Sequence, residues 1–192
     1  VPGCDVLTIP HNSNLSGPGI MFESAKLRKV DDAGMPVTAE EAALRRRWEP
    51  LVEIMQHKGD SECLLGGDTT DEACGFEKLP YNSFAGVGRI AAGNTLNTQG
   101  TSLEPDRRAT VREALKKGLV LEEELGENPL KYGIVASTDT HLGTPGLTME
   151  DDAKGHGGAG DRNRAGIPDN IEFNPGGLAV LWAEENTRDA LF

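Results

Sequence analysis

The chain has few cysteines and a deficit of basic residues, and each shortage excludes a class of protein. Cys4, Cys63 and Cys74 are odd in number and form no C-x-x-C pair, which argues against a disulfide framework and against a thiolate zinc site. Three unpaired thiols leave the localisation open while slightly favouring the cytoplasm. Lys and Arg number 19 against 31 Asp and Glu, a net charge of −12. Neither nucleic acid nor an anionic membrane surface is therefore an expected partner.

Long apolar runs and several common catalytic motifs are also missing. No apolar stretch approaches the roughly 18 residues that span a bilayer. The sequence contains no G-x-S-x-G, no G-x-x-x-x-G-K-[ST] and no H-E-x-x-H, so three familiar hydrolase and nucleotide-binding classes find no support. The chain starts at Val1 and stops at Phe192 inside a helical pattern. We therefore expect a single partial domain over 1–192, truncated at both ends.

Short apolar runs alternate with helical patterns along the chain. The runs that predict strands are 5–9, 51–56 and 131–138, with mixed strand and helix signals at 178–183. The patterns that predict helices are 38–48, 107–126 with an interruption at Gly118, and 186–192 with Asn186 as its cap. Alternating strands and helices favour an α/β fold with mainly parallel strands.

Helix ends and loops have their own signals. Thr38 and Glu41 have the spacing of a capping box at the start of the first helix, and Pro50 ends it. Gly126 is the expected stop of the second helix. The stretch 59–75 is rich in Gly, Asp and Thr, and 143–177 is rich in Gly. Both predict long loops, of which 143–177 is expected to cover a site.

Polar residues follow three of the predicted strands at once, in "TIPHN", "VEIMQHKG" and "IVASTDTH". In a sheet of parallel strands the carboxyl ends meet at one edge, where ligands bind. The sequence therefore predicts that these three clusters converge.

Asp139 and His141 are the first candidates for metal ligands. On an extended segment residues i and i+2 point to the same side, so a carboxylate and an imidazole can reach one ion. That pair of ligands suits Zn, Mn or Fe rather than Ca or Mg. The alternative is a polar turn in which Asp139 caps a backbone N–H and His141 is solvated.

His11 and Glu53 extend the same pattern. His11 follows an apolar run directly, between Pro10 and Asn12, although a loop histidine is the alternative. Glu53 alternates with apolar neighbours and faces the other way from them. In a sheet covered on both sides such a carboxylate needs an ion or an arginine beside it.

Weaker candidates lie beside these residues or in loops, as substrate contacts or as groups that support a ligand: Asn12, His57, Glu62, Thr138 and His156. The alternative for each is a solvated polar side chain. A Cys-His nucleophile pair also stays open, because Cys63 and Cys74 are near His57 in the sequence.

With "TIPHN", "LVEI" and "STDTH" in place, the sequence resembles the PHP (polymerase and histidinol phosphatase) superfamily. Longer stretches, "TIPHNSNLSG", "EPLVEIMQHKGDSE", "ACGFE", "STDTHLGTPG" and "NPGGLAVLWAEENTRDALF", resemble the PHP-like family catalogued as domain of unknown function 3604. The resemblance covers essentially the whole chain. It implies the C-terminal part of a distorted (β/α)7 barrel, similar to a TIM barrel, with long Gly-rich loops.

The resemblance also implies a function. PHP proteins are metal-dependent hydrolases, and a phosphoesterase that uses a metal-activated water is the most plausible activity here. By position, His11, Asp139 and His141 match metal ligands for Zn, Mn or Fe ions of unknown number. Asp139 and Glu53 are the catalytic carboxylates: Asp139 helps to orient the attacking water, and Glu53 supports or bridges the ligands.

The PHP pattern is incomplete in this chain, because the H-x-H strand and the histidine and glutamate that follow it are missing before "TIPHN". A chain with half of the ligand set can be inactive alone, and exposed sheet edges predict a homo-oligomer.

The expected substrate is a small phosphorylated molecule. The alternative function is a non-catalytic metal- or anion-binding module. A glycosidase that uses Glu184 and Glu185 is set aside, because adjacent glutamates cannot face one substrate.

Overall fold

The structure is a computed structural model that describes residues 6–15, 21–22, 37–56, 59–67, 69–75, 107–139 and 176–191. The helices and strands in these ranges are α1 (Ala39–Trp48), β1 (Leu51–Gln56), β2 (Gly59–Asp60), α3 (Val111–Leu125), β3 (Gly133–Ala136) and α4 (Arg188–Leu191). Three short 3-10 helices accompany them: η1 (Ser13–Leu15), η3 (Glu72–Gly75) and η4 (Arg107–Ala109).

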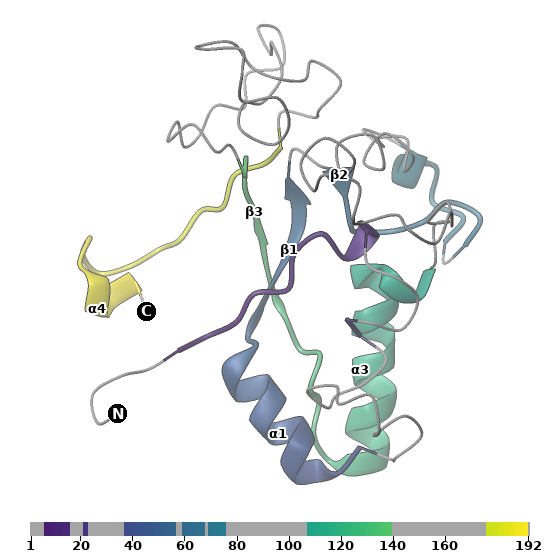
Figure 1. Ribbon diagram of the computed structural model, residues 1–192, viewed down its shortest axis with the longest axis horizontal. Coiled ribbons are helices and arrows are strands. Elements are labelled where there is room, and N and C mark those ends of the chain that lie inside the picture. Colours follow the sequence, from purple (N-terminus) through teal and green to yellow (C-terminus); the bar gives the residue numbers. More distant parts are fainter. Residues whose placement is uncertain are drawn as a thin grey trace, which may run out of the picture.

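The described strands form one small mixed sheet in the order β2-β1-β3. β1 and β3 run parallel, with Val52 beside Ile134, and β2 pairs antiparallel with the end of β1, with Met55 beside Asp60. Figure 1 shows β1 and β3 side by side, with α1 leading into β1 and α3 running along one side of the sheet. The sheet is open.

The prediction of a (β/α)7 barrel with mainly parallel strands is wrong for the part of the chain that the structure describes. The extended segments that flank the sheet contact it and α1 through scattered hydrogen bonds and do not pair with it as strands. Thr8 N–H donates to Trp48 O at 2.6 Å, and Gly177 N–H donates to Ser137 O at 2.8 Å. Because such single bonds do not build a ladder, neither segment extends the sheet. The expected buried strand at 5–9 is also wrong within residues 6–9, because Val6 is 60% exposed.

The first helix agrees with its sequence signals. Thr38 caps α1: its hydroxyl accepts from Glu41 N–H at 3.2 Å, and the Glu41 carboxylate accepts from Thr38 N–H at 3.0 Å. The predicted capping box is confirmed, and the helix ends at Trp48, just before Pro50.

Gly118 does not interrupt the second helix, contrary to the sequence prediction. α3 is continuous from Val111 to Leu125 and ends at Gly126, whose φ of 76° gives the expected left-handed stop. Gly118 is buried where the chain returns after the helix. A Cβ there would overlap Asn128 Oδ1, and that oxygen accepts from Leu130 N–H at 2.9 Å. The glycine is therefore required by close packing rather than by a break.

The core lies between α3, β1 and the segment that leads into β3. Its buried members are Phe22, Val52, Val111, Ala114, Leu130 and Tyr132. Beside it, Arg45 and Glu49 of α1 meet the hydroxyl of Tyr132: Arg45 Nη2 donates to Tyr132 Oη at 3.0 Å and to Glu49 Oε1 at 2.6 Å, and Tyr132 donates to the same Glu49 oxygen. This triad fastens α1 to the start of β3.

The C-terminal segment departs from expectation. Residues 178–183 form no strand and are exposed, up to 92% at Trp182. α4 is capped by Thr187, whose hydroxyl accepts from Ala190 N–H at 3.3 Å, rather than by Asn186. No helix in the described ranges is long and apolar enough to cross a membrane.

We expect Gly118→Ala to destabilise the protein although alanine is the better helix former. The gain in helix propensity is about 1 kcal/mol, but the methyl group overlaps the buried Asn128 amide, and overpacking costs about 1–3 kcal/mol on top of the strained hydrogen bond. Chemical unfolding should show a net loss. The matched control is Gly126→Ala, where a Cβ has open space and only the positive φ is penalised.

A second variant isolates the clash at Gly118. In the Gly118→Ala, Asn128→Ala double variant the overlapping amide is gone, so the total loss should be smaller than the sum of the single losses. Unchanged or raised stability of Gly118→Ala alone would contradict the packing of the loop on α3.

We expect one of the two tyrosines to stay un-ionised in alkaline solution until the chain unfolds. Burial raises the pKa of Tyr132 well above its ordinary 10.0; Arg45 opposes this and Glu49 adds to it. Because the folded pKa is raised, the stabilisation is complete below pH 10.0 and is lost as the pH rises beyond it. Tyrosinate absorbance should show a late step that Tyr132→Phe abolishes. Two tyrosines that ionise together near their ordinary pKa in the folded protein would refute this.

Candidate functional site

The end of β1 brings together the best described candidates. Glu53 N–H donates to Pro10 O at 2.9 Å, so His11 follows directly alongside Glu53. On the other side Ser137 N–H donates to Met55 O at 3.0 Å, so Thr138 and Asp139 follow β3 at the same end. Among the described residues, the segment that leads into His11 and the residues after β3 lie beside β1 without a barrel, because one parallel pair and one flanking segment are enough to bring them there.

The backbone is irregular on both sides of this end. The described non-glycine residues with positive φ are Asn12, at 50°, and Asp139, at 49°. β1 itself carries a register shift between Glu53 and Met55. Asn and Asp tolerate the left-handed region better than other side chains. Such irregularities gather at functional sites, where bulges re-aim side chains.

Glu53 has one satisfied and one unsatisfied carboxylate oxygen. Ser137 Oγ donates to Oε2, whereas Oε1 is buried and has no hydrogen-bond partner among the described residues. A buried carboxylate oxygen without a donor is costly, so this oxygen fits a cation or another ligand that compensates its charge. No sequence motif marks Ser137. Its place is set by the strand register: Glu53 pairs with Val135, and Ser137 lies two residues further along the same face, just past the end of β3.

A buried amide network holds the turn that carries His11. Gln56, 2% exposed, donates from Nε2 to Asn12 Oδ1 at 2.7 Å. His11 Nδ1 lies 3.2 Å from the same oxygen. Two residues on, Asn14 N–H donates to Ser61 Oγ at 3.2 Å and Ser61 Oγ donates to Asn14 Oδ1 at 3.0 Å. The sequence alone does not single out Gln56 and Ser61, because glutamine and serine have no motif of their own there.

The remaining candidates near this end are only partly described. Thr138 is buried and Asp139 half-buried. His57, His141 and His156 lie outside the described residues. Within the described ranges no group of three or more His, Cys, Asp and Glu side chains is arranged to hold one metal ion. The described contribution to such a site is therefore His11, Glu53 and Asp139 on neighbouring segments.

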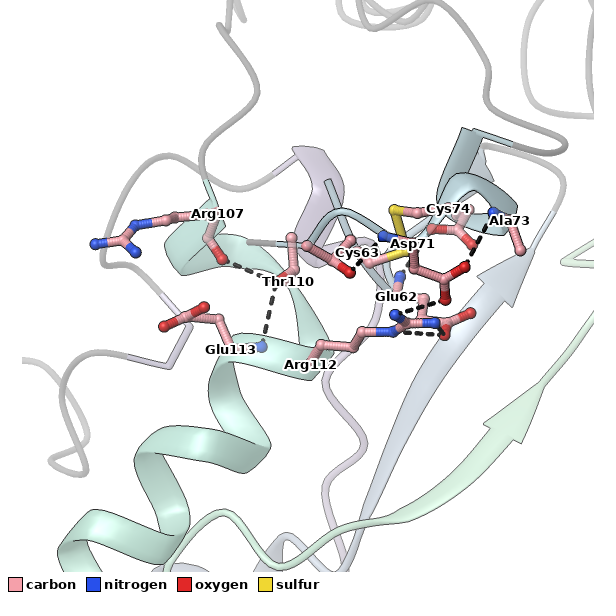
Figure 2. Close-up of a disulfide and its surroundings, with 11 residues drawn as sticks. Glu62, Cys63, Asp71, Ala73, Cys74, Arg107, Thr110, Arg112 and Glu113 are labelled. Atoms are coloured by element: carbon pink, nitrogen blue, oxygen red, sulfur yellow. Dashed lines mark hydrogen bonds and ion pairs between the residues drawn. A yellow bond between two sulfur atoms is a disulfide. The ribbon is translucent and has the colours of Figure 1, made fainter. Parts of the chain in front are cut away.

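Glu62 binds an arginine in the structure. Arg112, at the start of α3, donates from Nε at 2.8 Å and from Nη2 at 2.6 Å to Glu62 Oε1, and from Nη1 to Asp71 Oδ2 at 3.0 Å (Figure 2). The hydrogen bond from Arg112, aided by that from Ala73 N–H, lowers the pKa of Asp71. Glu62 therefore has a described role as an anchor between the loop 61–75 and α3.

The same loop is closed by a disulfide between Cys63 and Cys74, whose Cα atoms lie 5.9 Å apart (Figure 2). The expectation of unpaired thiols is wrong for these two residues. The chain reverses at Gly66 and Gly67, where Gly66 N–H donates to Thr69 O and Gly67 N–H donates to Leu64 O, both at 2.9 Å. A reversal of this kind pairs cysteines that lack C-x-x-C spacing.

This disulfide removes the basis for two expectations from the sequence, the cytoplasmic location and the Cys-His nucleophile pair. The cytoplasm was favoured by three free thiols, but structural disulfides persist mainly in oxidising compartments. The Cys-His nucleophile pair needed a free thiol near His57, and both nearby sulfurs are bonded.

Comparison with known proteins gives one match. The family model described as "Protein of unknown function (DUF3604)" matches residues 1–192. No curated protein and no solved structure is similar enough to match the chain.

We expect the unfolded, unreduced chain to react as a protein with one thiol, that of Cys4, and the reduced chain as one with three. The Cys63→Ser, Cys74→Ser double variant should lose about 3 kcal/mol of unfolding free energy, because a short loop is no longer closed in the unfolded chain. A thiol assay and chemical unfolding measure these effects. Cys4→Ser is the control, which removes the one free thiol. Three reactive thiols before reduction would exclude the disulfide.

Proposed function

Because the chain belongs to the DUF3604 family, described only as of unknown function, we propose its activity from the site itself: a metal-dependent hydrolase that acts on phosphate esters at the end of β1. The proposal includes a relationship to the PHP superfamily. That relationship rests on the motifs "TIPHN", "LVEI" and "STDTH" and on their chemistry.

One observation carries the proposal, the buried and unpaired Oε1 of Glu53. It lies on β1 between the segment that contains His11 and β3, which Asp139 follows. A cation compensates such an oxygen best, and a carboxylate with imidazole neighbours suits zinc, manganese or iron. The donor set therefore fits a divalent ion, although the described residues alone do not form a complete set of ligands for it.

The chain's own residues divide the work. His11 and Asp139 bind from either side of β1, and His141, two residues beyond Asp139, is the third ligand in this proposal. Ser137 holds the Glu53 carboxylate in place by donating to Oε2. Asp139 accepts the hydrogen bond that orients the attacking water.

A bound divalent ion supplies two effects: it lowers the pKa of a coordinated water and neutralises charge on phosphoryl oxygens. A small phosphorylated substrate is part of the proposal, since the ion provides positive charge for the phosphoryl group. The alternative, a binding module without turnover, uses the same ligands and differs only in lacking hydrolysis.

We expect the purified chain to retain about one equivalent or more of zinc, manganese or iron after reconstitution. Elemental analysis measures this. Less than about a tenth of an equivalent of any of these metals would overturn the ligand assignment. Metal retention together with hydrolysis of an aryl phosphomonoester or diester supports the hydrolase, and retention without hydrolysis supports the binding module. Where the chain is part of a longer protein, the hydrolysis is measured on that protein.

The informative variant is Asp139→Asn, since asparagine keeps the side-chain shape and tolerates the left-handed backbone. It should lose both metal and turnover, the latter by about 100-fold or more. The matched control is Asp189→Asn on α4, an exposed carboxylate on an element that lies away from the end of β1 (Figure 1). Retention of metal and turnover by Asp139→Asn would sink the proposal.

A further inference from the structure

Gln56 is a buried amide at the last position of β1, in a place where an apolar residue would pack more simply. Its side chain is 2% exposed, and its Nε2 donates to Asn12 Oδ1 at 2.7 Å. Burying an amide is favourable only when its hydrogen bonds are made. The partner that Gln56 meets across the sheet end is the residue next to His11.

Asn12 Oδ1 is shared between two neighbours. Besides Gln56 Nε2, it lies 3.2 Å from His11 Nδ1. A carboxamide oxygen can only accept, so this contact is a hydrogen bond only when His11 Nδ1 carries the proton. The lone pair of the neutral ring is then on Nε2, the form in which a histidine binds metal through Nε2.

The orientation of the Asn12 amide decides which ring nitrogen of His11 carries the proton. If the amide were turned over, its NH₂ group would take the place of the oxygen, and His11 Nδ1 would have to accept. Gln56 excludes that arrangement as long as it presents its own NH₂ group to Asn12. The backbone holds the amide within reach, since Asn12 has a φ of 50° and Asn14 is fastened to Ser61.

We propose that Gln56, acting through Asn12, is a positioning residue that fixes the tautomer of His11 and presents its Nε2 to a ligand. The effect on the ring stands on the geometry alone, and the identification of that ligand as a metal ion rests on the proposed function. Asn12 Nδ2 is buried and has no hydrogen-bond partner in the described ranges. In this arrangement it can donate an N–H to an oxygen of the ligand that His11 binds.

The experiment is ¹⁵N NMR of the His11 ring in metal-free protein, at a pH where the ring is neutral, with His11→Gln to assign its signals among the four histidines. In the wild type we expect a protonated Nδ1 and a pyridine-like Nε2. In Gln56→Glu the carboxylate can only accept, so it draws the Asn12 NH₂ group toward it and reverses the tautomer. Gln56→Met, with no hydrogen bond, should give a mixture.

Two controls keep the result decisive. Asp189→Asn on the exposed α4, away from the end of β1, does not touch the amide pair, so it should leave the His11 tautomer unchanged. Gln56→Glu carries the test if Gln56→Met does not fold, as judged by circular dichroism. A wild-type ring protonated at Nε2, or the same tautomer in the wild type and Gln56→Glu, overturns the proposal.

Zinc titration separates this inference from the proposed function. We expect the folded Gln56 variants to bind zinc about 10–100-fold more weakly, the usual effect of losing a group that orients a metal ligand. A reversed tautomer with unchanged zinc affinity would support the positioning role of Gln56 and count against His11 as a ligand. An unchanged tautomer refutes the positioning role whatever the zinc affinity.

Discussion

The parallel pairing of β1 with β3 is the constraint on which the candidate site depends. It sets Glu53 beside Val135, which puts Ser137 on the same face and within reach of the Glu53 carboxylate. It also brings the residues that follow β3 to the end of β1. A one-residue slip would turn Ser137 to the opposite face, so the register and the chemistry are specified together. Val52, fully buried in the core, opposes such a slip because it would become exposed.

The pairing is held from the other end of the sheet by α1. Tyr132, just before β3, meets Arg45 and Glu49 of α1 in a largely buried hydrogen-bonded triad. Removing Arg45 or Glu49 would leave the other as a largely buried charge without its ion-pair partner, which is far more costly than losing an exposed ion pair. The chain therefore separates two tasks. A polar triad fixes where β3 begins, and the residues that follow its end belong to the candidate site.

Features set by neighbouring residues, such as helix caps, were predictable from the sequence. Features set by contacts between distant parts of the chain were not. Thr38 with Glu41, and Gly126, are each read within one helical turn, and the structure confirms them. The need for glycine at position 118 is not visible locally, because it comes from the close approach of Asn128, which only the folded chain brings there. The Cys63–Cys74 disulfide was missed for the same reason, since its two cysteines meet only because Gly66 and Gly67 reverse the chain between them.

The candidate site shows the same division. His11 and Asp139 follow strand-like runs, a pattern visible in the sequence, and the structure brings both segments to the end of β1. Ser137 and Gln56 have no such pattern, because their importance depends on the register and on the partner across the sheet end. The barrel was an inference from resemblance, and the open sheet contradicts it. The motif chemistry is separable from that fold, since it requires only neighbouring strand ends.

Two unsatisfied atoms near the end of β1 restrict what can bind there. Within the part of the chain that the structure describes, Glu53 Oε1 is a buried acceptor without a donor, and Asn12 Nδ2 is a buried donor without an acceptor. A bare cation compensates Glu53 but leaves Asn12 Nδ2 unpaired. An anion alone pairs with Asn12 but places like charge near a carboxylate, which is unfavourable in a partly buried site. A cation that carries an oxygen ligand satisfies both atoms at once. This requirement favours an ion with a phosphoryl oxygen or a water over either species alone.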